Sequence, residues 1–384
     1  MPSPTVMGLV RRAGLAAAVA AAPLGLAYRF ALAYRARAGY PRQFPPIISP
    51  TDLGLPFETT TVRSGDLELP AWFIPARSGK PGPGVALIHG WESGRDKTLP
   101  NAVFLHAVGF HCLTIDVRGH GANPAETLPI SAGEFGLDAL ATFETLVSRP
   151  EVTVGAVVGH SMGAIGAILA AAADSRIAAV VATSAPADPY RLTRQTFRLA
   201  NLPIPDPIAY PLAWLTTRVY LAPRGHTVAD ISATQAIARY RGPILLAHGD
   251  ADQVVPFGHL GRLAAAARAT RTAADAAPVE TLLVPGGQHS WLYEDPTYRS
   301  TVARFLTTAL GGPLTPDEAA TIAAATNAER LADAESRFAA AADTPGGFRT
   351  LAQVALPGAT RPRRPGPAAT DPGVSPAADE PGLG

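Results

Sequence analysis

The sequence is short of cysteine, of net charge and of metal-binding motifs. Cys112 is the one cysteine in 384 residues, so no disulfide can form within the chain, and its apolar neighbours predict a buried strand residue. A formal charge of +1 gives no general attraction to nucleic acid, and we expect no nucleic-acid partner. The sequence holds no H-E-x-x-H pair, Cys/His cluster or G-x-x-x-x-G-K-[ST] loop, so we expect neither a metal nor a cofactor.

The first 42 residues contain a long apolar run. Arg11 and Arg12 precede it, and it extends from Ala13 to Tyr28 with Pro23 inside it. The pattern is compatible with an uncleaved membrane anchor over residues 11–34, with a cleaved secretion signal and with a peripheral or soluble helix. We expect membrane association through this helix. The side of the membrane stays open, because the arginines that follow favour the cytoplasm and a signal-like start favours export.

Composition divides the rest of the chain into segments. Residues 43–56 are rich in proline and predict an extended linker. Residues 57–310 predict one folded domain, interrupted at about 185–240 by a proline- and aromatic-rich insertion that we interpret as a lid over an apolar pocket. Residues 311–344 predict a helix that starts at Thr315-Pro316-Asp317-Glu318, with Ile322, Leu331 and Phe338 on its apolar side. The Pro/Gly/Ala-rich residues 345–384 predict a disordered tail.

Inside the domain, strand patterns alternate with helical ones. A hairpin signal at 64–66 joins two β-rich runs, at 57–62 and 67–74. Six further strands are predicted at 85–88, 113–117, 154–158, 177–182, 244–247 and 281–284, with helices at 99–108, 132–147, 162–173 and 259–269. This alternation predicts an α/β fold with a doubly wound, mostly parallel sheet, whose site lies at the carboxyl ends of the strands.

The motif Gly159-His160-Ser161-Met162-Gly163 stands between a predicted buried strand and a predicted helix. This is the context in which G-x-S-x-G forms a nucleophile elbow, a sharp turn that exposes the serine and needs glycine on both sides. The first free N–H groups of the helix then point at the carbonyl that the serine attacks. The motif therefore predicts nucleophilic acyl transfer by Ser161.

A serine nucleophile needs a histidine base and a carboxylate that orients it. The loop after strand 244–247 carries Asp250 and Asp252, and the loop after strand 281–284 carries His289. Both loops fall at the carboxyl ends of predicted parallel strands, and they follow the serine in the order Asp, His. We expect the other histidines in motif loops, His89, His120, His160 and His248, to shape backbone or line the pocket, and the remainder to be surface or partly buried side chains.

Together these motifs resemble the α/β-hydrolase superfamily. The resemblance includes His89-Gly90 after one strand and Asp116-Val117-Arg118-Gly119-His120-Gly121 after the next, and it covers about residues 57–308. Ser148-Arg149-Pro150-Glu151-Val152 is most similar to the dienelactone-hydrolase and prolyl-oligopeptidase-like branch. Ala122-Asn123 departs from the family, which has serine after its Arg-Gly-x-Gly motif.

The resemblance implies a role for each site residue. Ser161 would be the nucleophile, His289 the general acid and base, and Asp252 rather than Asp250 the orienting carboxylate. The backbone N–H groups of Trp91 and Met162 would form the oxyanion hole. We expect a serine hydrolase that cleaves carboxylic esters with small to medium apolar acyl groups. An acyltransferase, aminopeptidase or lactonase would use the same machinery, and a non-catalytic binding protein of the same fold is the alternative of a different class.

Overall fold

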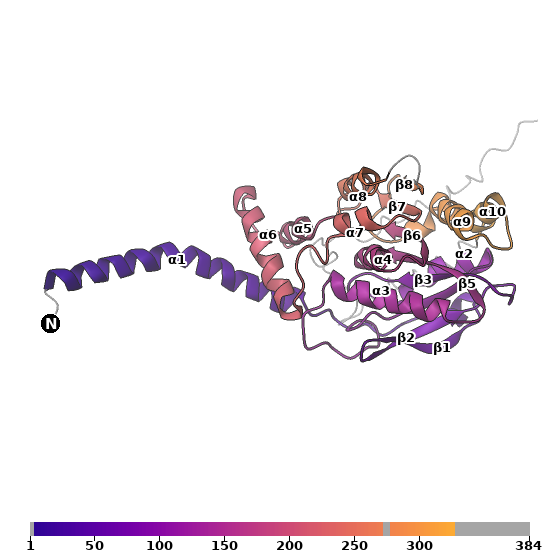
Figure 1. Ribbon diagram of the computed structural model, residues 1–384, viewed down its shortest axis with the longest axis horizontal. Coiled ribbons are helices and arrows are strands. Elements are labelled where there is room, and N and C mark those ends of the chain that lie inside the picture. The colour runs from indigo at the N-terminus through magenta and orange to yellow at the C-terminus, as the bar shows by residue number, and fades with distance from the viewer. Residues whose placement is uncertain (1–3, 272–276, 327–384) are drawn as a thin grey trace, which may run out of the picture.

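Eight strands form one sheet in the order β1-β2-β4-β3-β5-β6-β7-β8 in the computed structural model, which describes residues 4–271 and 277–326 (Figure 1). β1 and β2 form an antiparallel hairpin, β2 pairs antiparallel with β4, and every later neighbour pairs in parallel. The predicted fold class is confirmed. The strands are β1 (Glu58–Ser64), β2 (Leu67–Ile74), β3 (Gly82–Ile88), β4 (His111–Ile115), β5 (Val152–His160), β6 (Ile177–Thr183), β7 (Ile244–Gly249) and β8 (Val279–Val284).

Helices cover both faces of the sheet. α3 (Ala132–Val147), α4 (Met162–Ala173), α7 (Ala233–Arg239) and α8 (Gly258–Ala269) contribute to the core on one face, and α2 (Leu99–Ala107), α9 (Pro296–Leu310) and α10 (Pro316–Ala324) to the core on the other. Alternate residues of β3 point to opposite faces: Ala86 and Ile88 join the first core, whereas Val85 and Leu87 join the second. Two-sided burial explains the continuous apolar runs. Cys112 is fully buried in β4, as predicted.

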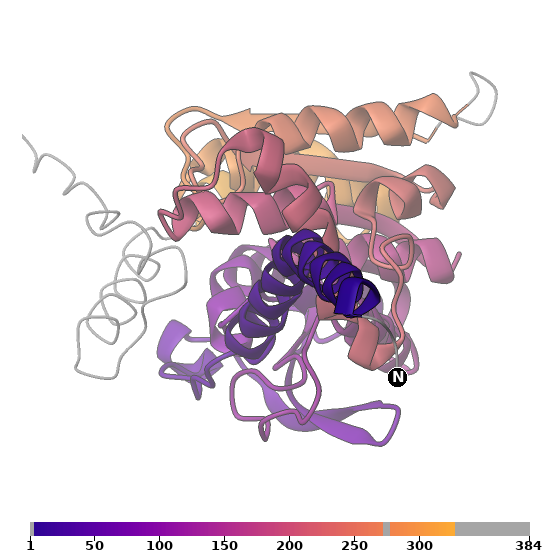
Figure 2. The same cartoon turned by 90° about the vertical axis from the view of Figure 1, so that its left-hand side faces the viewer.

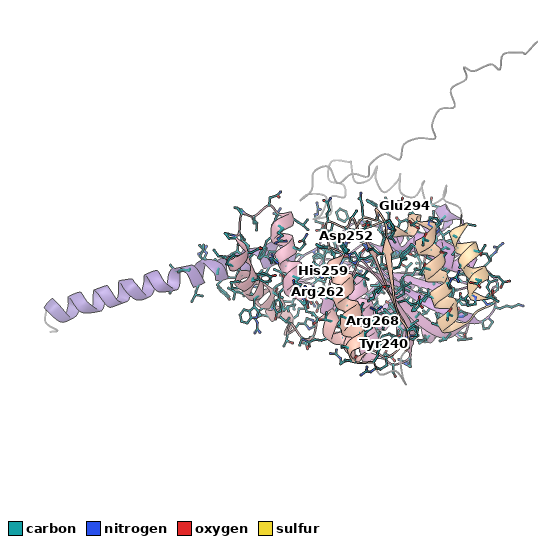
Figure 3. All side chains as sticks on the ribbon, turned by 90° about the horizontal axis from the view of Figure 1, so that it is seen from above. Tyr240, Asp252, His259, Arg262, Arg268 and Glu294 are labelled. Carbon is teal, nitrogen blue, oxygen red and sulfur yellow. The ribbon has the colours of Figure 1, made fainter. Side chains whose placement is uncertain are left out.

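The crossover from β7 through α8 shows why loops collect at one edge. Tyr240 precedes β7 and Asp252 follows it, and Figure 3 shows these two residues at opposite ends of that layer. α8 returns in the opposite direction, from His259 near Asp252 to Arg268 near Tyr240 (Figure 3). The loop that follows each parallel strand therefore lies at the same edge of the sheet, and Ser161, Asp252 and His289 all lie in such loops.

The insertion is narrower than the sequence predicted. α5 (Pro189–Leu199), α6 (Asp206–Leu221) and the short 3-10 helix Ala222–Arg224 stand outside the sheet-covering layers, but α7 packs between α4 and α8 as an ordinary crossover helix. Ala236 and Ile237 of α7 are fully buried. The inserted part therefore ends before α7 rather than at residue 240. Two of its side chains tie it to α3, because Arg224 and His226 contact Glu134.

The N-terminal run forms one helix, α1 (Pro4–Ala38), and continues through Pro23. Its far end projects from the body of the protein (Figure 1). Within residues 4–271 and 277–326, no helix combines the length and the apolar character needed to cross a membrane. The segment 43–56 is not the extended linker that its prolines predicted. Its apolar side chains pack under α2, and its buried residues are Phe44, Ile48, Pro50, Leu53 and Leu55.

The C-terminal part differs from its prediction in two ways. The sequence reasoning missed α9, although Asp295 followed by Pro296 is a helix-start signal and Asp295 accepts a hydrogen bond from the N–H of Thr297. α10 does begin at the predicted Thr315–Glu318 capping box, but it ends at Ala324 and leaves Ile322 exposed. Its buried face consists of Ala319, Ala320 and Ala323. Leu331, Phe338 and the predicted tail 345–384 lie outside the described residues.

Candidate active site

Ser161 occupies a sharp turn between β5 and α4. Its φ of +54° and ψ of −116° are a strained combination for a residue with a side chain. A Cβ on Gly159 would collide with the carbonyl group of Gly163, and a Cβ on Gly163 would collide with the carbonyl oxygens of Ile88 and His89. Both glycines are therefore required by the close approach of neighbouring backbone, as the elbow prediction assumed.

Two hydrogen bonds connect the three predicted side chains. His289 Nε2 lies 3.0 Å from Ser161 Oγ, and His289 Nδ1 lies 2.8 Å from Asp252 Oδ2. Because the carboxylate only accepts, Nδ1 carries the proton, and Nε2 is left with a lone pair that faces the serine hydroxyl. The structure thus brings residues 128 and 37 positions apart into one chain of hydrogen bonds.

Asp252 is buried and fully partnered. Its side chain has no exposed surface, and Oδ1 accepts hydrogen bonds from the N–H groups of Val254 at 2.9 Å and Val255 at 2.8 Å. His248 Nε2–H donates to the Val255 carbonyl at 2.7 Å, and the same nitrogen lies 3.2 Å from Asp252 Oδ2. Burial alone would raise the pKa of Asp252. The electrostatic interaction with His289 and the hydrogen bonds from His248, His289 and Val255 outweigh burial and hold that pKa below its usual range.

The loops that carry Asp252 and His289 are joined to each other. Gly249 and Gly287 approach so closely that a Cβ on Gly249 would overlap the Gly287 backbone. The exposed Asp250 accepts a hydrogen bond from the N–H of Gly286 at 2.6 Å, so it joins the two loops and does not contact His289. Gly287 is therefore required for the close packing of the two loops, and the imidazole of His289 already lies within reach of Ser161.

The loop after β3 is ordered by His89. Its Nε2 accepts the N–H of Val117 at 3.0 Å, so Nδ1 carries the proton and donates it to the Gly90 carbonyl at 2.7 Å. That carbonyl belongs to the same planar peptide as the N–H of Trp91, so fixing one fixes the direction of the other. A Cβ on Gly90 would lie 3.3 Å from Ser161 Cβ, which places this peptide beside the serine.

Trp91 and Met162 flank the serine from two elements. The Trp91 ring packs edge-on against His120, with ring centroids 5.1 Å apart, and lies stacked on Phe135 at 6.5 Å. Met162 is the first residue of α4, where a helix has no carbonyl one turn earlier to receive the N–H. The two backbone donors predicted from the sequence therefore belong to segments that meet at Ser161.

Comparison with known proteins agrees with this arrangement. The sequence model of the alpha/beta hydrolase family matches residues 85–299, more than half of the chain. The chain belongs to this family. An uncharacterized protein of Mycobacterium tuberculosis is 29% identical over 245 residues, which are 63% of this chain and 75% of the relative.

Two crystal forms of an esterase from Pyrococcus furiosus have similar structures. One has a TM-score of 0.56 and 21% identity, covering 71% of this chain and 98% of the esterase. The other has a TM-score of 0.54 and 24% identity, covering 71% and 100%. At these identities the likeness shows the fold, and it agrees with the family assignment.

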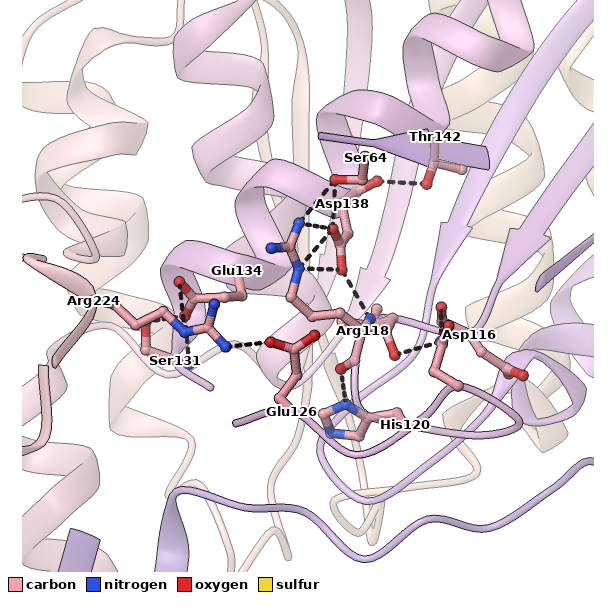
Figure 4. Close-up of polar contacts among 12 residues, drawn as sticks. Ser64, Asp116, Arg118, His120, Glu126, Ser131, Glu134, Asp138, Thr142 and Arg224 are labelled. Atoms are coloured by element: carbon pink, nitrogen blue, oxygen red, sulfur yellow. Dashed lines mark hydrogen bonds and ion pairs between the residues drawn. The ribbon is translucent and has the colours of Figure 1, made fainter. Parts of the chain in front are cut away.

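In this α/β hydrolase, the Asp116–Gly121 motif supports the loops around the site. Asp116 accepts the backbone N–H groups of Arg95 at 2.7 Å and Ala122 at 2.9 Å, and it pairs with the Arg95 guanidinium. Burial raises its pKa in spite of these partners. Arg118 forms a buried ion pair with Asp138 of α3, and Ser64 Oγ–H donates to the same carboxylate at 2.7 Å (Figure 4). Asp138 and Ser64 were not singled out from the sequence.

Two contacts of this α/β hydrolase could not be read from its motifs. The Nε2–H of His160 donates to the backbone carbonyl of His289 at 2.7 Å, and Ser184 Oγ–H donates to the same oxygen at 3.1 Å. Burial lowers the pKa of His160 to about 4, so the ring is neutral near pH 7. Within residues 4–271 and 277–326, no three His, Cys, Asp or Glu side chains are grouped to hold a metal ion.

Proposed function

We propose that this protein is a serine hydrolase in which Ser161, His289 and Asp252 form a catalytic triad. The observation that carries the proposal is the hydrogen-bond chain from Asp252 Oδ2 through the imidazole to Ser161 Oγ, at 2.8 and 3.0 Å. A serine that served only the turn would not need an imidazole nitrogen 3.0 Å from its hydroxyl. The strained backbone at Ser161 is a second support, since strain of this kind gathers at reactive residues.

The proposed reaction has two acyl-transfer steps. Ser161 Oγ attacks the substrate carbonyl carbon while its proton moves to His289 Nε2, and the N–H groups of Trp91 and Met162 receive the developing oxyanion. The tetrahedral intermediate collapses, His289 returns the proton to the leaving oxygen, and an acyl-enzyme remains. A water that gives its proton to the same nitrogen then releases the acid and restores the serine. Asp252 stabilises the imidazolium at both stages, and no metal or cofactor is required.

We propose carboxylic esters with small to medium apolar acyl groups as substrates. The support comes from the insertion, which reaches the site: Gln195 Nε2 of α5 donates to the carbonyl of Gln253, next to Asp252, at 2.9 Å. Apolar groups flank the serine as well, since Trp91 and Met162 are half-buried beside it. The similar P. furiosus protein is an esterase, which favours an ester over an amide.

A graded series of p-nitrophenyl esters, run beside the matching p-nitroanilides, tests this proposal. We expect turnover of the shorter esters, little turnover of the anilides, and a loss of at least about a thousandfold in kcat for Ser161→Ala. Ser148→Ala is the matched control, because Ser148 is exposed at the end of α3 and should keep full activity. Faster turnover of the anilides would replace the esterase assignment by a peptidase. Unchanged activity in Ser161→Ala would contradict the triad.

A further inference from the structure

The charge of this protein is concentrated in three helices at one end. α1, α5 and α6 contain nine arginines and one aspartate, a net of +8, whereas the whole chain carries +1. Figure 1 shows the three helices together at the end from which α1 projects, and Figure 2 shows α1 end-on in front of the insertion. The remaining residues therefore carry a net negative charge. Such a separation creates a strongly positive end on a nearly neutral molecule.

The same end exposes large apolar side chains. The first half of α6 directs alanines inward and large apolar residues outward: Ala209 and Ala213 are buried, whereas Ile208, Tyr210 and Trp214 are 57%, 46% and 46% exposed. A surface helix of a soluble domain normally has the reverse arrangement. A run of large exposed apolar groups of this kind marks an interaction surface.

α1 adds to this surface and is fixed to it. Leu24 and Leu26 are each 72% exposed. A few residues further along the helix, Phe30 packs edge-on against Phe197 of α5 at 5.4 Å, and Tyr34 OH bonds Thr196 Oγ1 at 2.8 Å. α1 and the insertion are therefore one packed unit. We call the exposed residues Leu24, Leu26, Tyr28, Ile208, Tyr210 and Trp214, with Arg29, Arg37, Arg194, Arg198 and Arg218, the apolar-basic end.

Two of these arginines lie directly over exposed aromatic rings. The Arg218 guanidinium carbon is 3.9 Å from the centroid of Trp214, and that of Arg194 is 4.2 Å from the centroid of Tyr210. Tryptophan and tyrosine prefer the boundary between lipid headgroups and acyl chains, and arginine beside them binds anionic headgroups while its stem covers apolar surface. A second copy of the chain fits this end poorly, because a symmetric dimer would bring two basic surfaces together.

We propose that the apolar-basic end docks onto the surface of an anionic lipid bilayer. Trp214, Tyr210 and Ile208 enter the headgroup boundary, the arginines pair with lipid phosphates, and the exposed turns of α1 lie in the same interface. The insertion is then part of the membrane-binding surface together with the N-terminal helix. This inference does not depend on the triad, so its failure would leave the proposed hydrolase chemistry untouched.

Sedimentation of the full chain with lipid vesicles tests the proposal. We expect binding to phosphatidylcholine vesicles that contain phosphatidylglycerol, weaker binding to phosphatidylcholine alone, and a decrease as salt is added. The double variant Ile208→Ala/Trp214→Ala should lose about tenfold or more in partitioning, because it removes two side chains that enter the interface. Leu137→Ala is the matched control, since Leu137 is 52% exposed on α3, outside the apolar-basic end.

A second measurement covers the case in which the double variant does not fold. Vesicles with brominated acyl chains should quench part of the tryptophan fluorescence of the unaltered protein, and Trp214→Phe should remove that quenching while binding persists. Three results would overturn the proposal. They are a failure of the protein to sediment with anionic vesicles, a loss of vesicle binding in Leu137→Ala as large as that in the double variant, and a concentration-dependent dimer that forms without binding vesicles.

Discussion

The base of the proposed triad is held by its main chain as well as by Asp252. His160, the residue before the nucleophile, and Ser184, just after β6, both donate to the carbonyl of His289. The rings of His160 and His289 are 4.9 Å apart. The turn that raises Ser161 therefore also fixes the backbone of its partner. His160 is a positioning residue in this account.

Replacing His160 by phenylalanine should lower kcat by about tenfold and leave KM nearly unchanged. The lost hydrogen bond loosens the His289 loop, whereas Ser184 still holds the carbonyl, so the loss is partial. His160→Gln should recover most of the activity, because its amide can donate from nearly the same position. Steady-state kinetics of both variants on one ester, with thermal unfolding measured alongside, checks this. A parallel loss in both variants, or a rise in KM alone, would argue against a positioning role.

At this scale the sequence could predict residues that sit in motifs but not contacts made through backbone atoms. Ser161, Asp252 and His289 each follow a recognisable strand, so their convergence could be expected. The bond from His160 depends on a carbonyl 129 positions away, and no pattern within either segment indicates it. The resemblance favoured Asp252 over Asp250, and the structure adds a physical reason, because Asp250 accepts a hydrogen bond from the N–H of Gly286.

At the scale of elements, the elbow between β5 and α4 has little room for an added side chain. Gly163→Ala should destabilise the protein by about 1–3 kcal/mol or more, because the added methyl group meets the carbonyl oxygens at the end of β3. Gly261→Ala is the matched control. Nothing lies within 4 Å of a Cβ at this position in α8, so the same change should stabilise by about 0.5–1 kcal/mol. Urea unfolding of both variants measures the difference, and equal effects would refute the close-packing explanation.

The helix α10 shows which features of an element its own sequence can predict. Its start was predictable because both partners of the capping box, Thr315 and Glu318, lie within four residues. Its buried face was not, because that face is set by α9. The Arg299 guanidinium of α9 donates to the carbonyls of Ala323 and Ala324, and alanines let the two helices come close. The large apolar residue Ile322 consequently faces solvent.

On the scale of the whole molecule, buried neutral histidines should make the fold sensitive to acid. Burial is the largest cause in each case. It lowers the pKa of His89, His160 and His259 to about 4 and that of His120 to about 3, from an ordinary value of 6.5. The unfolded chain therefore binds more protons than the folded one between about pH 6.5 and about pH 4, so the free energy of unfolding should fall across that window as acid is added. Urea unfolding at about pH 7 and about pH 5 tests this, and a flat profile would contradict it.

His226 provides a control of opposite sign. Its hydrogen bond to Glu134 raises its pKa, so its contribution is present below about pH 6.5 and is lost as the pH rises past the raised value. Arg224, Asp230 and Glu126 are the other charged groups around this contact. His226→Gln should therefore destabilise the protein more at about pH 5 than at about pH 8. An equal effect at both values would exclude the ion pair between the insertion and α3.

The arrangement as a whole was predictable wherever strand and helix patterns alternate, since parallel crossovers leave few alternatives. The packing of the insertion against α1 could not be predicted, because it depends on contacts between distant segments, such as the contact of Tyr34 with Phe197. Because large apolar side chains of both segments face outward, their apolar pattern does not indicate which face is buried.

Covalent labelling with a fluorophosphonate probe, followed by mass mapping of the modified peptide, tests the proposed nucleophile most directly. The account predicts one adduct on Ser161, retained in Ser148→Ala and absent from Ser161→Ala. Folded protein that resists the probe, or an adduct on a different serine, would contradict it.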